Sequence, residues 1–283
     1  MKSITISALL FAAGMFAAPA APPLEFPAPS PACTVKQRVG LTDIEIVYSR
    51  PGVKDRQIFG GLVPYGEVWR TGANQATKIV FSTPVKFNGA DVPAGTYGLF
   101  TIPGENEWTV ILNKVPEQWG GYQYDAKKDL VRVKTTPVTI AEHVETLMID
   151  FNDIRDESAV LDLIWENTLV PVKIEVELAG KLVPQIESTM AGPGDKKPYY
   201  QAAMFYYDHG LDLQKARKWI DAAVAERETF YIVHLKAKIL AKLGEKEGAI
   251  AAAKRSSELA LKAEGPKSGY IKMNNDLIAR LNG

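Results

Sequence analysis

The sequence contains little cysteine and little histidine, and these absences exclude several kinds of protein. Cys33 is the only cysteine among 283 residues, so no internal disulfide can form and the fold must be held by its hydrophobic core. His143, His209 and His234 are far apart, and neither they nor Cys33 form a motif with metal-ligand spacing. We therefore expect no zinc or copper centre and no other cofactor.

Charge of one sign is not in excess either, because 33 Lys and Arg residues balance 33 Asp and Glu residues. Proteins that bind nucleic acid carry an excess of basic residues, so a nucleic-acid partner is not expected. A hydrophobic content of 46% excludes a disordered chain. Phosphate-binding glycine loops and the nucleophile elbow of serine hydrolases are also missing, so no motif indicates a reaction class.

Long apolar runs are missing beyond the N-terminus, where the sequence has the pattern of a signal peptide. Lys2 precedes an uncharged apolar stretch at 4–18, and small residues follow at Ala18 and Ala20. The stretch is shorter than the roughly 20 residues that span a bilayer, although a membrane anchor is the alternative. We interpret residues 1–20 as a signal peptide and expect an exported protein, periplasmic or on the outer surface, with no transmembrane span in the mature chain.

Residues 21–32 contain prolines throughout and predict an extended linker between the signal peptide and the first domain. Cys33 follows this linker directly. Attachment of a lipid to Cys33 is an alternative to a free thiol, but the distance from the apolar stretch favours the free thiol.

The mature chain changes character near residue 180. Short alternating runs of Val, Ile, Thr, Trp and Tyr fill residues 33–180 and predict about ten strands, with a tight hairpin turn at Asn88 and Gly89. No helix-length periodic segment interrupts them, so we expect an all-β antiparallel sandwich, jelly-roll-like, of two sheets packed face to face. The main strands are expected at 43–48, 77–81, 85–87, 96–102, 108–112, 130–135, 144–151, 159–165 and 170–176.

The second half predicts a small all-α domain of helical hairpins at 196–283, after a linker at 181–195. Gly210 and Gly244 are 34 residues apart, which is the period of tetratricopeptide repeats, and small residues follow each glycine. An ordinary helical bundle with a coincidental spacing is the alternative. Helices are expected at 197–209, 213–226, 230–243, 246–263 and 267–281.

Charge divides at the same boundary. Residues 21–180 hold 15 basic and 21 acidic residues, whereas residues 181–283 hold 17 basic and 12 acidic residues. The neutral chain is therefore an acidic sandwich joined to a basic helical tail. We expect the tail to contact protein, either the sandwich or an acidic partner.

One string of residues resembles a known family. The runs Ser49-Arg50-Pro51 and 65–77, which contains Trp-Arg-Thr-Gly-Ala-Asn, look like the bacterial domain-of-unknown-function family 2911. The resemblance extends over roughly residues 35–178 and excludes the tetratricopeptide-like tail. It implies an exported protein with no established activity, and it transfers no catalytic residue.

The same string lies in a long glycine- and proline-rich segment, 49–77, which is the best candidate for a binding site. Arg70 can present paired donors to a carboxylate or sugar, and Trp69 can offer a stacking face. Glu67, Asn74 and Arg50 complete this candidate set. The alternative is structural: a buried Glu67–Arg70 pair, or Arg70 bonded to loop carbonyls, with Asn74 capping a turn. For Arg50 the alternative is a solvated side chain or a pair with a local acid such as Asp55.

A second candidate surface is an aromatic loop containing Trp119 and Tyr122, which suits recognition of carbohydrate or protein as well as packing over an open end of the sandwich. The acidic turn 152–157 carries carboxylates suited to Ca²⁺, but its spacing departs from known calcium loops and it is interpreted as a surface turn.

These observations favour an exported, non-catalytic binding or scaffold protein. Its sandwich loop would bind a small polar ligand, a glycan or a partner, and its helical tail would contact protein. The alternative is an exported glycan-acting hydrolase in which Glu67 is the general acid or base and Arg70 orients the substrate.

Overall fold

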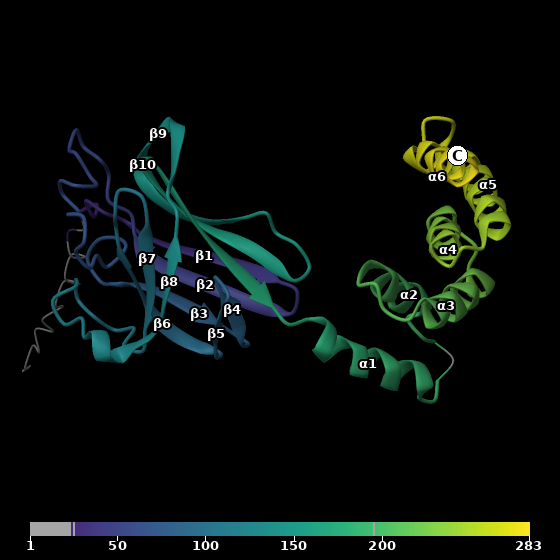
Figure 1. The fold of residues 1–283 in the computed structure, drawn as a ribbon, viewed down its shortest axis with the longest axis horizontal. Coiled ribbons are helices and arrows are strands. Elements are labelled where there is room, and N and C mark those ends of the chain that lie inside the picture. Colours follow the sequence, from purple (N-terminus) through teal and green to yellow (C-terminus); the bar gives the residue numbers. More distant parts are fainter. Residues whose placement is uncertain (1–23, 25, 195) are drawn as a thin grey trace, which may run out of the picture.

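We describe the fold from a computed structural model, which describes residues 24, 26–194 and 196–283. The predicted signal peptide, 1–20, lies outside the described residues. Ten strands form two packed sheets, and six α-helices follow them (Figure 1). The predicted fold class, an antiparallel sandwich followed by a helical domain, is confirmed. Among the described residues, no helix is both long and apolar enough to cross a membrane.

The larger sheet has six antiparallel strands in the order β1-β2-β3-β6-β7-β8. Alternation explains its buried face: in β2, Ile44, Ile46 and Tyr48 are buried while the residues between them are more exposed. The strands are β1 (Ala32–Val39), β2 (Thr42–Ser49), β3 (Thr77–Phe81), β6 (Gly95–Ile102), β7 (Trp108–Asn113) and β8 (Asp129–Thr135), with a short 3-10 helix at Ala126–Lys128.

The smaller sheet has the order β5-β4-β10-β9. It consists of β4 (Val85–Phe87), β5 (Ala90–Val92), β9 (Val138–Asn152) and β10 (Ser158–Val176). Asn88 and Gly89 both have positive φ between β4 and β5, as the predicted hairpin turn requires.

The last two strands are longer than the sequence predicts. A single strand, β10, replaces the two strands expected at 159–165 and 170–176, because a β-bulge at Glu166 carries the chain across the gap. Glu166 has φ +50°, and its carboxylate accepts a hydrogen bond from the backbone N–H of Ile58 at 3.2 Å. The bulge therefore turns a charged side chain toward the loop after β2 instead of ending the strand.

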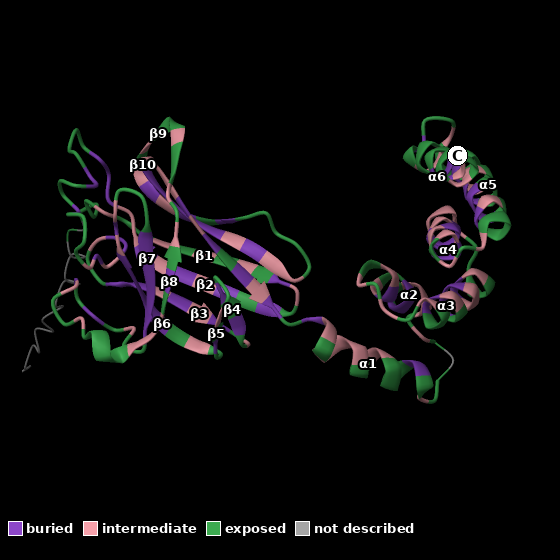
Figure 2. Cartoon of the chain, viewed as in Figure 1, coloured by how far each residue is buried: buried purple, intermediate pink, exposed green. Residues whose placement is uncertain are grey.

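The core of the sandwich lies between the two sheets (Figure 2). Aromatic side chains from both sheets meet there, and the largest fully buried ones are Trp108, Trp165, Phe81 and Phe87. A core of this size compensates for the absence of disulfides, because burying each large apolar side chain contributes about 1.5–3 kcal/mol.

The predicted linker at 181–195 is a helix over most of its length. Helix α1 spans Ala179–Ala191 even though it contains Pro184. Proline inside a helix removes a backbone donor and normally disfavours a helix. Val183, Ile186 and Met190 pack against the helical core, and this burial offsets the cost of the proline.

The remaining helices agree closely with the predicted ranges. They are α2 (Tyr199–Asp208), α3 (Leu213–Glu226), α4 (Phe230–Lys242), α5 (Lys246–Glu264) and α6 (Gly269–Asn282). Asp212 caps α3 by accepting hydrogen bonds from the N–H groups of Gln214 and Lys215. Ala216, Ala249 and Ser256 are fully buried and Ala223 is 3% exposed, so the small residues that follow Gly210 and Gly244 lie where helices approach closely.

Candidate functional site

The segment between β2 and β3, residues 50–76, runs beside β6 and contributes apolar side chains, among them Ile58, Phe59 and Trp69, to the core between the two sheets. Trp69 exchanges backbone hydrogen bonds with Thr101 of β6, at 2.7 and 2.9 Å. Val68 and Ala76 pack with Phe100 and Ile111 in a small cluster separate from the main core. The irregular segment is thus anchored at both ends of the Trp-Arg-Thr-Gly-Ala-Asn string.

Trp69 is a structural residue in this arrangement. Its side chain is 8% exposed and stacks on Trp165 with ring centres 5.7 Å apart and an angle of 17° between the rings. Its Nε1–H donates to the carbonyl of Gly72 at 3.1 Å. Because the ring is enclosed, the stacking face that the sequence suggested for a sugar is occupied by protein.

Thr71 and Gly72 hold the backbone next to Arg70 in a strained conformation. Thr71 has φ +56°, which is uncommon for a β-branched residue, and its carbonyl accepts a hydrogen bond from Thr77 Oγ1 at 2.6 Å. A Cβ atom at Gly72 would lie 3.0 Å from the carbonyl oxygen of Ser49, so a larger residue requires the backbone around it to shift. Strain that packing maintains in this way is typical of segments that position a functional side chain.

Arg70 is the side chain that this backbone presents. It is half-buried, and its buried Nε–H has no hydrogen-bond partner among the described residues. None of the ion pairs found in the described chain, with N–O distances up to 4.0 Å, includes Arg70. Burial lowers the pKa of the guanidinium, and the neighbouring Tyr122 phenol acts in the opposite direction. Arg70 is therefore a desolvated cation without a counter-charge from the described protein.

The aromatic loop lies directly beside Arg70. Gly120 N–H donates to the carbonyl of Asn74 at 3.0 Å, and Ala76 N–H donates to the carbonyl of Gln118 at 2.9 Å. Trp119 is 62% exposed and Tyr122 is 88% exposed. The two candidate surfaces that the sequence treated separately, the segment 49–77 and the loop with Trp119 and Tyr122, are thus one surface.

The other predicted site residues are placed differently. Arg50 donates from Nε to the carbonyl of Leu147 at 2.9 Å, and Asn74 donates to the carbonyl of Ser30 and to Ser49 Oγ. Both side chains tie the segment to its neighbours, whereas the structural alternative expected Arg50 to be solvated or paired with Asp55 and Asn74 to cap a turn. Glu67 is exposed and makes no ion pair within the described part of the chain, so the buried Glu67–Arg70 pair of that alternative is absent there.

Sequence reasoning missed the polar network that supports the aromatic loop. Asp129 accepts hydrogen bonds from Tyr124 Oη at 2.7 Å, Arg132 Nε at 2.7 Å and Asn113 Nδ2 at 2.8 Å. Burial and the bond to Asp129 raise the pKa of Tyr124 to about 12. These residues come from β7, β8 and the loop between them, and no local motif in the sequence indicates that they meet.

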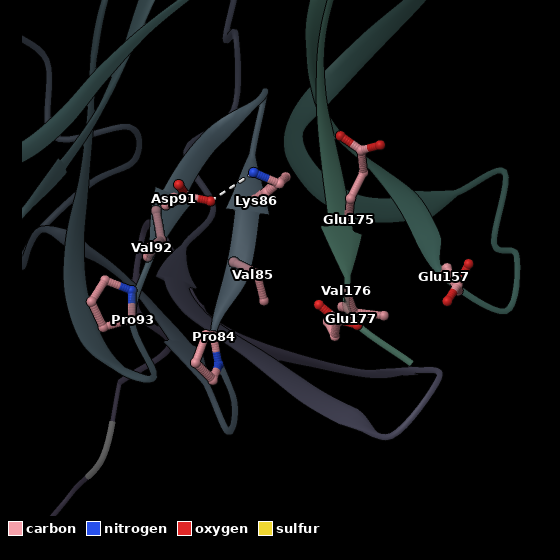
Figure 3. A pocket seen from close by; sticks show the side chains of 10 residues that line it. All are labelled: Pro84, Val85, Lys86, Asp91, Val92, Pro93, Glu157, Glu175, Val176 and Glu177. Atoms are coloured by element: carbon pink, nitrogen blue, oxygen red, sulfur yellow. Dashed lines mark hydrogen bonds and ion pairs between the residues drawn. The ribbon is translucent and has the colours of Figure 1, made fainter. Parts of the chain in front are cut away.

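A pocket of about 660 Å³ lies elsewhere on the sandwich, between β4–β5 and the end of β10 (Figure 3). Val85, Val92 and Val176 are among its apolar lining residues, and glutamates stand at its rim. Two of these glutamates accept hydrogen bonds from backbone N–H groups at the start of α1. Glu157 accepts one from Ala179 at 3.2 Å, and Glu177 accepts one from Gly180 at 3.0 Å.

The acidic turn next to this pocket shows no grouping of metal ligands among the residues that the structure describes. Instead, Asp153 pairs with Arg155 at 2.6 Å, and His209 at the end of α2 lies 3.7 Å from Glu157. The turn therefore faces the helical domain.

The fold and the surface around Arg70 define an antiparallel β-sandwich with a polar and aromatic surface at one loop cluster, joined to a helical domain. A family described as a protein of unknown function (DUF2911) matches residues 30–174, which is just over half of the chain. The chain belongs to this family. No curated protein and no solved structure matches the chain.

Proposed function

We propose that this chain is an exported, non-catalytic binding protein whose sandwich binds a carboxylate-bearing ligand at Arg70. The observation that carries the proposal is the half-buried guanidinium, whose buried Nε–H has no partner among the described residues. A buried donor without an acceptor costs about 1–3 kcal/mol, and an anionic ligand supplies the missing acceptor. Arginine binds carboxylates through paired hydrogen bonds in one plane, which gives such a site both strength and direction.

The neighbouring aromatic loop indicates the rest of the ligand. Tyr122 and Trp119 are exposed beside Arg70, and aromatic rings offer apolar faces that bind the CH groups of a sugar or another ring. Together they favour a small molecule with both a carboxylate and a ring, such as a uronic acid. Exposed Glu67 lies in the same segment, three residues before Arg70, and its charge would select against ligands with two adjacent negative charges.

Export is supported by the N-terminal signal pattern and by the single cysteine, which is compatible with an oxidising compartment. The catalytic alternative receives less support. A general acid or base is usually shielded and held by neighbours, whereas Glu67 is exposed and has no hydrogen-bond partner in the described structure.

The test is a thermal-shift series with glucuronate, galacturonate, glucose and glucosamine on the mature protein. We expect the two uronates to raise the melting temperature and the neutral and amino sugars to leave it unchanged, since only ligands of the folded state stabilise it. Arg70→Gln should abolish the shift, whereas Arg38→Gln, at an exposed position on β1, should retain it.

Uronate shifts of equal size in Arg70→Gln and wild type would disprove binding at Arg70. A shift that also appears with glucose would show that the carboxylate is not recognised. If turnover of a uronate-containing glycan were detected and lost in Glu67→Gln, the catalytic alternative would replace the proposal.

A further inference from the structure

A groove in the helical domain is lined by basic side chains that have no acidic partner among the described residues. It has a volume of about 490 Å³ and is lined by residues of α2, α4 and α6. These three helices lie along the inner side of the arc formed by α2–α6, with α3 and α5 along the outer side (Figure 1). The groove residues used below are Tyr207, Lys238, Lys242, Met273, Asp276 and Arg280.

Two lysines share one aromatic ring in this groove. Lys238 and Lys242 are four residues apart on α4, so their side chains project from the same side of the helix. Their ammonium groups lie 4.5 and 4.9 Å from the centre of the Tyr207 ring. The ring attracts both cations, but it carries no net charge and leaves their mutual repulsion uncompensated.

Arg280 brings a third cation from α6, and the acid in the lining does not neutralise the group. Neither of the two lysines nor Arg280 is part of an ion pair in the described chain. Asp276 is the only acid that lines the groove, and its carboxylate pairs with Lys272 at 2.7 Å, outside the lining. The groove therefore has an uncompensated positive charge.

A second pocket of the same domain provides an internal comparison. It has a volume of about 430 Å³, lies among α3, α4 and α5, and also contains three basic residues, Arg217, Lys236 and Arg255. There each cation has a carboxylate partner: Glu245 for Arg217, Asp221 for Lys236 at 2.7 Å and Glu228 for Arg255 at 2.7 Å. Within the described chain, the basic residues of one pocket are thus paired with carboxylates, whereas those of the other contact neutral groups, such as the Tyr207 ring and, for Lys242, the Tyr207 carbonyl at 3.4 Å.

We propose that the groove between α2, α4 and α6 binds an acidic segment of a partner protein. Carboxylates of that segment would pair with Lys238, Lys242 and Arg280, and an apolar side chain between them would pack on Met273, which lines the groove and is 42% exposed. The apolar lining favours a peptide over a uniformly charged polyanion, because carboxylate and apolar groups alternate along peptides. This site is separate from the sandwich surface at Arg70, so either proposal can fail without the other.

The test is fluorescence anisotropy with a fluorescein-labelled peptide of alternating glutamate pairs and leucines, titrated with the full mature chain. The variant Lys238→Gln/Lys242→Gln/Arg280→Gln removes the three cations of the groove. Its matched control, Lys254→Gln/Lys262→Gln/Lys267→Gln, removes three exposed cations elsewhere on the same domain. We expect the groove variant to bind about tenfold or more weakly and the control to bind within about twofold of wild type.

A melting curve of the groove variant should match or exceed that of wild type, because like charges are removed. If the variant is unstable, the single change Lys242→Gln at an exposed position takes its place, with about a threefold loss expected. The proposal is overturned if the groove variant and the control lose affinity for the peptide equally. It is also overturned if wild type shows no binding up to about 1 mM protein. Binding of a heparin fragment that depends on the same residues, without peptide binding, overturns it in favour of an anionic glycan.

Discussion

Replacement of Arg70 by methionine should stabilise the free protein while removing its ligand site. Methionine retains the aliphatic stem of the side chain but carries neither the charge nor the buried Nε–H that has no partner in the described structure. We expect a binding site to contain such a destabilising group, because the ligand supplies its hydrogen-bond acceptor only when it binds. A structural arginine would behave in the opposite way.

The magnitude follows from the surroundings of Arg70. An unsatisfied buried donor costs about 1–3 kcal/mol, and the half-buried guanidinium places Arg70 at the lower end of this range. Removing the unsatisfied donor stabilises the protein by that amount, but repacking around methionine costs about 0.5 kcal/mol. The net stabilisation is therefore about 0.5–1 kcal/mol. For a domain of this size, such a change raises the melting temperature by about 1–4 °C.

The assay is thermal and urea unfolding of Arg70→Met, Arg38→Met and wild type, followed by tryptophan fluorescence. Most of the tryptophans, including Trp69 and Trp165, belong to the sandwich, so fluorescence reports mainly on that domain. The helical domain has a core of its own, and its unfolding is followed separately by circular dichroism at 222 nm. A melting temperature lowered by more than about 5 °C would refute the reasoning, because that loss is typical of breaking a buried pair.

Three further predictions concern the support of this surface. Trp69→Ala should lower the free energy of unfolding by about 3–5 kcal/mol in urea denaturation, because the ring stacks on Trp165 inside the core; a loss below about 1 kcal/mol would contradict its structural role. Gly72→Ala should cost about 1–3 kcal/mol through the contact with the carbonyl of Ser49, and unchanged stability would show that the loop adapts. The folded-state pKa of Tyr124 is raised to about 12 from 10.0, so the contribution of this phenol to stability is complete below pH 10 and is lost as the pH rises toward 12. Tyr124→Phe should remove this part of the alkaline loss of stability, and identical curves of stability against pH for variant and wild type would disprove it.

The regular elements were predictable from the sequence because their signals are local. Alternation in Asp43–Tyr48 and the Asn88-Gly89 turn depend on neighbouring residues alone, and both predictions are confirmed. Helix α1 and the continuous β10 escaped prediction because tertiary contacts overrule local signals there: Pro184 disfavours a helix that packing maintains, and Glu166 forms a bulge that only its partner strand reveals.

The candidate surface was predictable in its residues but not in its arrangement. The string around Arg70 stands out in the sequence, yet the burial of Trp69 depends on Trp165, which is almost a hundred residues away. Likewise, the lack of a carboxylate partner for Arg70 among the described residues is a property of the whole fold, because only three-dimensional placement shows which carboxylates lie within reach. Composition identified the candidates, and long-range packing separated the enclosed side chains, such as Trp69, from the exposed ones, such as Tyr122.

The division of charge along the chain gives the two proposed sites different responses to salt. Arg70 lies on a sandwich with an excess of acidic residues, so the long-range field of that domain opposes an anionic ligand even though the site itself is positive. The groove with Lys238 and Lys242 lies on a domain with an excess of basic residues, whose field favours the same kind of ligand. At about 0.15 M salt, charges more than about 8 Å apart are largely screened. Raising the ionic strength should therefore slow association of the acidic peptide with the groove, while association of a uronate with the sandwich should be unchanged or faster in stopped-flow measurements. Equal slowing at both sites would show that the fields of the two domains do not act separately.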